Sequence, residues 1–366
     1  MYEVNNERVL AMFIDLVKIS SPSWRERGVI EYISSVLKRL DVPLTLYPCG
    51  ESHNLLARID GDASIKPVLF SCHMDTVTPC EGVRPVIAKN KISSDGTTVL
   101  GSDDKAAVAA FLEAMHILRE QKPRHGPIEF LFSCAEEVGL HGIKGFDLTR
   151  LNADYAFVFD SGGDVGKIVL EAPSQVILEL AVRGRAAHAG IEPEKGVSAI
   201  RVLSEILSAI PNGRIDSETT CNAGIIAGGK ATNIVADDAY CKLEFRSISR
   251  TKLAAVEKKI RDISAATAKR HGARVKIARH LEYTGFSISK ESPVARIASA
   301  ALRKMRIEPV YESSGGGSDT NVINRAGIKA INLSSGMRNV HTTREYILKR
   351  DLVNCARLVL ALIDAI

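Results

Sequence analysis

Five short apolar runs in this sequence each deliver an acidic residue or a histidine at their carboxyl end. The runs are PVLFSCHMD, GTTVLGSDD, IEFLFSCAEE, DYAFVFDSG and AINLSSGMRNVH. Each has the length and composition of a buried strand. In an open parallel sheet, ligands bind at the edge formed by the carboxyl ends of the strands. We therefore expect one group of polar residues to meet at that edge: His73, Asp103, Glu136, Glu137, Asp160 and His341.

The residue types in this group are those of a metal site. Two imidazoles and several carboxylates, without a cluster of thiolates, suit divalent zinc, manganese or cobalt. Glu136 and Glu137 stand side by side after an apolar strand, where two like charges repel each other unless a cation is present. Adjacent carboxylates can also divide the work, because one can bind a metal while the other accepts a proton from water. We therefore expect a metalloenzyme.

Two of these motifs also allow structural interpretations. Asp75, two residues after His73, can orient the ring of that histidine, although most His-x-Asp triplets have no such role. Asp103 can bridge two metals, or it can cap the helix predicted for KAAVAAFLEA, since acidic residues favour helix starts. Asp104 can face solvent or begin that helix.

Composition excludes several other classes of function. The net charge is +5 with Lys and Arg spread along the chain, and aromatic residues make up 5%, so neither a basic face nor a stacking platform for nucleic acid is evident. Seven cysteines without CxxC spacing argue against a disulfide framework. No run approaches the roughly 18 apolar residues of a membrane span, and the first 20 residues form an amphipathic pattern. We expect a soluble, cytoplasmic protein that binds a small molecule.

The order of the predicted elements indicates an insertion. Helices over residues 5–40, broken at 21–23, are followed by alternating strands and helices that predict an α/β fold. Between residues 175 and 284 the order becomes β-α-β-β-α-β, the split arrangement of a ferredoxin-like unit. We therefore predict a catalytic domain of residues 1–174 and 285–366 with a mixed, largely parallel sheet, interrupted by a ferredoxin-like α+β domain of residues 175–284.

Eight ordered motifs resemble one enzyme family over nearly the whole chain. They are HMDTV, LGSDDKAAVAA, SCAEEVGLHGIKGFD, FDSGG, GRAAHAG, ATNIVADDA, GGGSDTNVI and NVHTTREYI. The family is the co-catalytic dinuclear zinc peptidases, which include peptidase T, glutamate carboxypeptidases and aminoacylases. EEVGLHGIKGFD and FDSGG are most similar to the peptidase T-like branch.

The resemblance implies a role for each residue at the strand ends. His73, Asp103 and Asp160 would bind one metal, and Asp103, Glu137 and His341 the second, so that Asp103 bridges the pair. A hydroxide would lie between the ions, Glu136 would act as the general base, and Asp75 would support His73. The two divalent ions would be zinc, with cobalt or manganese as alternatives.

The inserted domain resembles the lid and dimerisation domain of the same family. His188 would polarise the scissile carbonyl, in its own or a partner subunit's site. Asn233 and Arg246 would hold the substrate, the Arg with its planar pair of donors. Gly317, in GGGSD, would offer a backbone N–H to an anion, although this stretch can also be a flexible turn, as Arg246 can be a solvated strand residue. The resemblance also implies a homodimer formed through this domain.

The sequence therefore predicts a dinuclear metallopeptidase acting on short peptides, as a tripeptidase or aminopeptidase. An amidohydrolase of N-acyl amino acids would use the same machinery, and pocket shape would decide between the two. A catalytically silent metal-binding relative is a third interpretation, but both Asp75 and Glu136 are retained.

Overall fold

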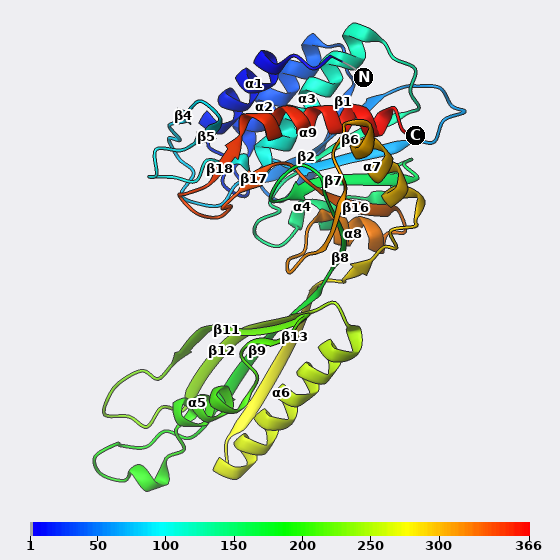
Figure 1. Cartoon of the computed structure of the whole chain (residues 1–366). Helices are drawn as coiled ribbons and strands as arrows, with labels where there is room; N and C mark the ends of the chain where they lie inside the picture. Colours follow the sequence, from blue (N-terminus) through cyan, green and yellow to red (C-terminus); the bar gives the residue numbers. More distant parts are fainter. Residues whose placement is uncertain (1–2) are drawn as a thin grey trace. The chain divides into compact units, whose positions relative to one another are not determined.

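A nine-stranded mixed sheet forms the centre of the larger part of the computed structural model, which describes residues 3–366 (Figure 1). The strand order is β1-β2-β6-β3-β7-β16-β8-β14, with β15 beside β8. The neighbours β6, β3, β7 and β16 run parallel, whereas the β1–β2, β2–β6 and β16–β8 pairs are antiparallel. The predicted mixed, largely parallel sheet is confirmed. The strands are β1 (Leu44–Cys49), β2 (Ser52–Ile59), β3 (Val68–His73), β6 (Ile128–Ser133), β7 (Tyr155–Ser161), β8 (Lys167–Ala172), β14 (Phe286–Ser287), β15 (Val310–Ser313) and β16 (Lys329–Ser334).

Helices cover this sheet, and one of them is buried along most of its length. Helix α3 packs against β3, α1 and α9, which explains why KAAVAAFLEAMHIL is mostly apolar and buried on nearly all sides (Figure 1). Asn5 caps α1 by accepting the N–H of Arg8, and Ser292 caps α7 in the same way. The helices are α1 (Asn6–Lys18), α2 (Arg27–Arg39), α3 (Ser102–Gln121), α4 (His141–Gly145), α7 (Pro293–Lys304), α8 (Asp319–Arg325) and α9 (Lys349–Ile363), with a 3₁₀ turn at Leu148–Arg150.

Phenylalanines of the parallel strands fill the core beneath the functional edge. Phe70 of β3 stacks against Phe130 of β6 and Phe157 of β7, with ring centroids 5.3 and 5.8 Å apart. Phe111 of α3 packs edge-on against Phe159 of β7. These rings are fully buried, so the strands that end in polar residues are held in place by tightly packed aromatic side chains.

One predicted strand is wrong. GTTVLGSDD forms no strand: residues 94–101 are irregular, and Ser102 begins α3. The nearest strand, β5 (Lys91–Ser93), belongs to a separate small sheet of order β17-β18-β5-β4, with β4 (Val86–Ile87), β17 (Met337–Arg338) and β18 (Tyr346–Leu348). Asp103 therefore reaches the functional edge from a helix start.

The smaller part of the chain is a five-stranded antiparallel sheet with two helices. Its strand order is β10-β11-β12-β9-β13, in which β11-β12-β9-β13 is the arrangement expected of a ferredoxin-like unit, while β10 was not expected. Side chains of β12 alternate between buried and half-exposed, as in a strand with one covered face. The elements are β9 (Ser174–Arg183), α5 (Ala199–Ala209), β10 (Gly213–Asp216), β11 (Thr219–Gly228), β12 (Asp238–Ser247), α6 (Arg250–His271) and β13 (Arg274–Tyr283), with a 3₁₀ turn at Pro193–Lys195.

The two parts are compact units with their own cores. The larger comprises residues 1–170, 288–313 and 318–366, and the smaller comprises 171–287 and 314–317. We predicted domain boundaries after residues 174 and 284. The units divide after residues 170 and 287, and residues 314–317, in and next to GGGSD, belong to the smaller unit. None of the helices within residues 3–366 is both long enough and apolar enough to cross a membrane.

Candidate metal centre

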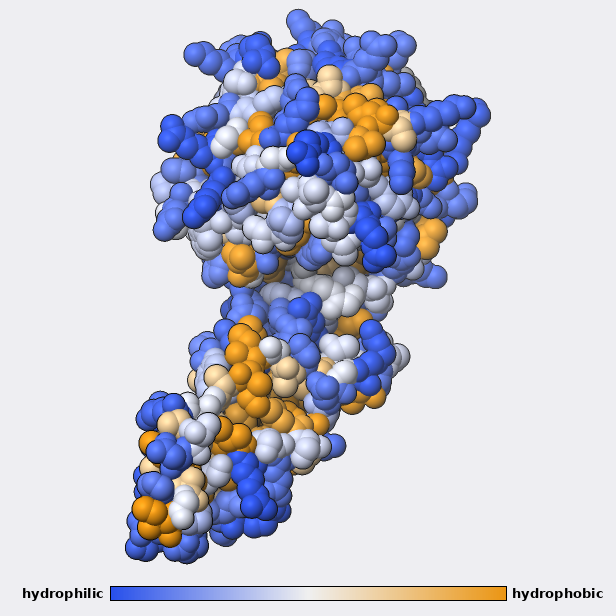
Figure 2. Space-filling model, turned by 90° about the vertical axis from the view of Figure 1, so that its left-hand side faces the viewer, coloured by the Kyte–Doolittle hydropathy of each residue, from blue (hydrophilic) through white to orange (hydrophobic). Residues whose placement is uncertain are grey.

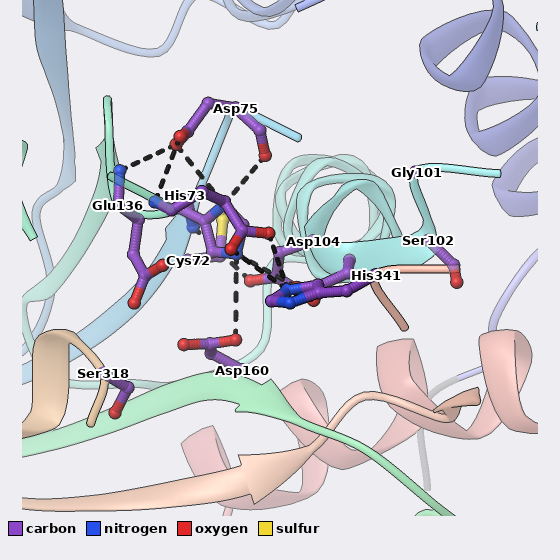
Figure 3. A network of polar contacts seen from close by, with 12 residues as sticks. Cys72, His73, Asp75, Gly101, Ser102, Asp104, Glu136, Asp160, Ser318 and His341 are labelled. Carbon is purple, nitrogen blue, oxygen red and sulfur yellow. Dashed lines mark hydrogen bonds and ion pairs between the residues drawn. The ribbon is translucent and has the colours of Figure 1, made fainter. Parts of the chain in front are cut away.

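His73 stands at the end of β3 with both ring nitrogens engaged (Figure 3). Its Nε2 lies 3.1 Å from Oδ1 of Asp103 and 3.7 Å from Oδ1 of Asp160. On the other side, its Nδ1 lies 2.9 Å from the backbone oxygen of Asp75. The ring is 2% exposed, so Asp75 fixes its orientation in a buried position while Nε2 faces the carboxylates.

Asp103 lies between the two imidazoles. Its Oδ1 faces His73, and its Oδ2 lies 3.2 Å from Nε2 of His341. The same His341 nitrogen lies 3.0 Å from Oε2 of Glu137. One carboxylate therefore joins a His73–Asp160 group to a His341–Glu137 group, which is the arrangement of a bridging ligand.

The donor atoms are close enough to share a metal ion. Single ligand atoms of His73, Asp103 and Glu137 lie within 4.8 Å of one another, and so do those of His73, Asp104 and Asp160. Of the two neighbouring aspartates, Asp104 uses one oxygen to accept the backbone N–H of His73 at 3.4 Å. Asp103 is the one of the two that faces both His73 and His341. Asp104 is fully buried, so the possibility that it faces solvent is wrong.

The electrostatics of the group favour a cation. Burial, followed by the charge of Asp160, raises the pKa of Glu136 well above its usual range, and burial also raises the pKa of Glu137 and Asp160. Hydrogen bonds to Asp103 and Glu137 raise the pKa of His341 to about 10. The protein thus gathers more negative charge here than its two imidazoles can balance. With imidazole nitrogens and carboxylate oxygens as donors, the residues fit divalent zinc, cobalt or manganese.

The Glu136–Glu137 pair is presented by a strained turn after β6. Ala135 has a φ of +47°, in a region that residues with a Cβ rarely adopt, and Leu140 closes the turn with a φ of +59°. The two carboxylate oxygens of Asp75 accept the N–H groups of Glu136 and Glu137 at 2.9 and 3.2 Å. Asp75 therefore positions both His73 and the glutamates. His341 has a φ of +61°, so this candidate metal-binding residue also lies on strained backbone.

Glu345 holds the Asp103 segment and was missed in the sequence. It accepts hydrogen bonds from the N–H groups of Leu100, Gly101 and Asp103, at 2.8 to 3.0 Å, and from the hydroxyl of Ser102 at 2.6 Å. The only available signal was its position four residues after His341 in NVHTTREYI.

The four expected substrate contacts fall into two groups within the smaller unit. His188 and Asn233 lie on adjacent exposed loops, where the N–H of Ala189 donates to the Asn233 carbonyl at 2.9 Å. Arg246 is half-buried at the far end of β12 and pairs with Glu244 at 3.0 Å. Gly316 and Gly317 lie at that same end: a Cβ on Gly316 would be 3.8 Å from the Arg246 guanidinium, and one on Gly317 would overlap the ring of Tyr283.

Strand β12 separates these two groups. Residues 238 to 246 of an extended strand span roughly 26 Å. Within one chain, His188 and Asn233 are therefore too far from Arg246 and Gly317 for all four to contact one small substrate.

Comparison with known proteins identifies related enzymes. The profile of peptidase family M20/M25/M40 matches residues 69–365. Uncharacterized protein YqjE of Bacillus subtilis (strain 168) is 38% identical over an alignment of 366 positions that covers 99% of each chain. Peptidase T of Enterococcus faecalis is 28% identical over 262 residues, or 70% of this chain and 63% of that relative.

Solved structures of similar proteins cover nearly the whole chain. Aminopeptidase PepT from Bacillus cereus superposes with a TM-score of 0.91 at 38% identity, covering 99% of both chains. A tripeptidase from Staphylococcus aureus superposes with a TM-score of 0.93 at 33% identity, covering 98% of both chains.

Proposed function

This chain belongs to peptidase family M20/M25/M40, and we propose that it releases N-terminal residues from short peptides, tripeptides above all, at a centre of two divalent metal ions. It is a metal-dependent hydrolase of peptide bonds. The observation that carries the proposal is the position of Asp103 between His73 and His341, beside the paired glutamates. The names of the similar aminopeptidase and tripeptidase support the choice of substrate.

Five residues would hold the ions. His73 and Asp160 would bind one, His341 and Glu137 the other, and Asp103 both. When bound, the ions supply positive charge that polarises the scissile carbonyl and lowers the pKa of water. Zinc is the proposed metal, with cobalt and manganese as alternatives that the same donors accept.

Glu136 is the proposed general base. His73 and His341 pair with Asp103, Glu137 and Asp160, and within the described part of the chain neither imidazole pairs with the Glu136 carboxylate. It takes a proton from the attacking water and returns one to the leaving amine. Asp75 supports this role because it holds the N–H of Glu136 and orients His73.

Substrate contacts from the smaller unit would come from two subunits. His188 and Asn233 are separated from Arg246 and Gly317 by the length of β12, so one site can use all four only if a partner subunit supplies one group. We propose that Arg246 and the backbone at Gly317 hold the substrate in their own chain's site, and that His188 and Asn233 act in the partner's site. His188 would donate to the oxygen of the polarised carbonyl.

The proposed homodimer would form through the smaller unit. Hydrophobic side chains gather on the face of this unit seen in Figure 2. Ile225 and Ile226 on β11 are 54% and 60% exposed, and Ile200 on α5 is 44% exposed. Exposed apolar patches of this kind are typical of protein interfaces.

A cytoplasmic location is also proposed. The seven cysteines are free thiols, and six of them are buried, which suits a reducing compartment.

One assay tests the substrate class. Metal-loaded protein is incubated with dipeptides, tripeptides and N-acetyl amino acids, and the liberated amine is measured, with Glu136→Gln as the inactive control. We expect tripeptides to be cleaved fastest and acetylated amino acids not at all. Faster release from acetylated amino acids would identify an N-acyl amino acid amidohydrolase instead. Absence of turnover on every substrate by fully metal-loaded protein would indicate a silent relative.

A further inference from the structure

We propose that Glu26, in the loop between α1 and α2, is a positioning residue for the catalytic glutamate. This loop, residues 19–26, contains no proposed metal ligand or substrate contact. It nevertheless touches three of the segments that carry the metal centre. The inference rests on the proposed role of Glu136 as general base.

Glu26 fastens the strained turn that presents Glu136. Its carboxyl group is fully buried, and its Oε1 accepts the N–H of Ala135 and the N–H of Trp24, both at 2.9 Å. Ala135 is the residue with a φ of +47°, directly before Glu136. Left unpaired, the buried N–H of Ala135 would favour relaxation of this turn. Glu26 therefore fixes the backbone at the base of the Glu136 side chain.

Ser23 fastens the next peptide through Asp75. The Ser23 hydroxyl donates to Oδ2 of Asp75 at 2.6 Å, and the carboxylate of Asp75 in turn accepts the N–H groups of Glu136 and Glu137. The loop thus holds the backbone before and at the two glutamates: Glu26 binds the N–H of Ala135 directly, and Ser23 acts through Asp75 on the N–H groups of Glu136 and Glu137.

The loop is anchored to the other two ligand segments. The Ser21 hydroxyl donates to the carbonyl of Met74 at 3.0 Å, and the N–H of Thr76 donates to the Ser21 carbonyl at 2.9 Å, so the loop runs beside the His73–Asp75 segment. Lys105, buried two residues after Asp103, donates from Nζ to the Ile19 carbonyl at 2.7 Å. A displacement of this loop would therefore alter the relative positions of base and ligands.

The alternative is that Glu26 only stabilises the fold, and three variants separate the two roles. Glu26→Ala removes the acceptor of the Ala135 N–H. Glu26→Gln keeps a carbonyl oxygen that can accept both N–H groups but removes the charge. Glu113→Ala is the matched control. Glu113 is another fully buried glutamate: it accepts the backbone N–H of Asn5 at 2.9 Å and pairs with Arg8 at 2.6 Å, and among the described residues it makes no contact with the metal centre.

The first measurement is steady-state turnover at a temperature where all variants are folded. A displacement of about 1 Å in a reacting group can cost roughly 100-fold in rate. We expect Glu26→Ala to lower kcat roughly 10- to 100-fold with KM and metal content unchanged, Glu26→Gln to stay within about threefold of wild type, and Glu113→Ala to lower Tm without lowering kcat. Ser23→Ala, a milder change, should lower kcat roughly 3- to 10-fold and serves if Glu26→Ala does not fold.

The second measurement does not depend on activity or metal. Amide hydrogen exchange of the peptide covering residues 134–142 is followed in metal-free protein, where Glu26→Ala should increase exchange and Glu26→Gln and Glu113→Ala should not. Trp24 is the only tryptophan, and its ring lies 5.2 Å from that of His141, so its fluorescence reports whether the loop itself stays folded.

Three results would overturn the inference: unchanged kcat and exchange in Glu26→Ala, equal losses of kcat in Glu26→Ala and Glu113→Ala, or equal losses in Glu26→Gln and Glu26→Ala. The last would mean that charge, and not backbone position, matters. Normal turnover in Glu136→Gln would instead contradict the proposed function itself.

Discussion

The functional edge of the larger unit and the expected substrate contacts of the smaller unit are built differently. At the edge, His73, Asp75 and Asp103 are buried, and each makes several polar contacts inside one unit. In the smaller unit, His188 and Asn233 lie exposed on two loops that are joined by the backbone hydrogen bond from Ala189 to Asn233. The first region is arranged by its own unit. For the second, we propose that a partner subunit completes the site.

Because of this difference, we expect mutations at the edge to change metal binding and mutations in the smaller unit to change catalysis alone. Buried charges that face one another are costly unless a cation compensates them, so changes at the edge should alter metal binding. Exposed side chains of the smaller unit carry no such cost. Changes there should leave metal content intact and affect only turnover.

Substitutions of the two adjacent glutamates at the edge should have the strongest effects, and the effects should differ. Glu136→Gln removes the proton acceptor but keeps its shape, so turnover should fall by roughly 10²–10⁴-fold or more with metal retained. Glu137→Gln should lose metal, because a carboxylate that pairs with His341 is replaced by a neutral amide. Kinetics and elemental analysis of both variants provide the check. Near-normal turnover in Glu136→Gln would show that the general base is another group.

The next effect tests the smaller unit. His188→Ala should lower turnover by roughly 10²–10³-fold, the cost of one lost donor to the developing oxyanion, without depleting metal. Mixing inactive His188→Ala with inactive Glu136→Gln under subunit exchange should restore activity, because a mixed dimer contains one site with both residues.

Two outcomes would contradict the partner-supplied donor. A strictly monomeric protein that loses activity on His188→Ala would require that His188 reach the site of its own chain. Full activity of His188→Ala would remove the residue from the mechanism altogether.

The smallest effect concerns stability at the edge. Burial raises the pKa of Asp319 to about 7. Its Oδ2 accepts the hydroxyl of Ser133 at 2.6 Å, while its Oδ1 has no hydrogen-bond partner among the described residues. The pKa of Asp319 in the folded protein is above the unfolded value of about 3.9. Between pH 4 and 7 this carboxyl therefore ionises in the unfolded chain but stays protonated in the folded one, so its contribution to the stability of the folded protein is largest below pH 4 and is lost as pH rises towards 7. Asp319→Asn should therefore make metal-free protein more stable than wild type at pH 8, by roughly 2–4 kcal/mol, and this gain should shrink towards pH 4. Urea unfolding at both pH values measures it; a gain independent of pH would exclude ionisation as the cause.

The architecture could be predicted from the sequence because the hydrophobic pattern of each strand and helix lies within that element. Apolar runs indicated β3, β6, β7 and β16, and the change of rhythm after residue 174 indicated the smaller unit. The same reasoning placed most of the polar residues at strand ends, although the fold brings Asp103 from a helix start and His341 from a turn seven residues beyond β16.

The supporting residues could not be predicted in this way, because their partners are distant in the chain. Glu345 binds the N–H of Asp103 from 242 positions away, and Glu26 binds that of Ala135 from 109 positions away. Neither glutamate has a periodic or compositional signature. Sequence patterns therefore identified residues with the chemistry of a metal site, whereas only the fold identifies the residues that hold them.

Metal stoichiometry shows whether Asp103 joins two metal positions into one centre. Metal-free protein is titrated with zinc and the bound metal is counted by elemental analysis, beside Asp103→Asn and the single-site variant Asp160→Asn. Two ions per chain are expected for wild type, with both sites weakened in Asp103→Asn and one in Asp160→Asn. A single ion or a fractional value in active wild-type protein, or two tightly bound ions in Asp103→Asn, would contradict the bridging role.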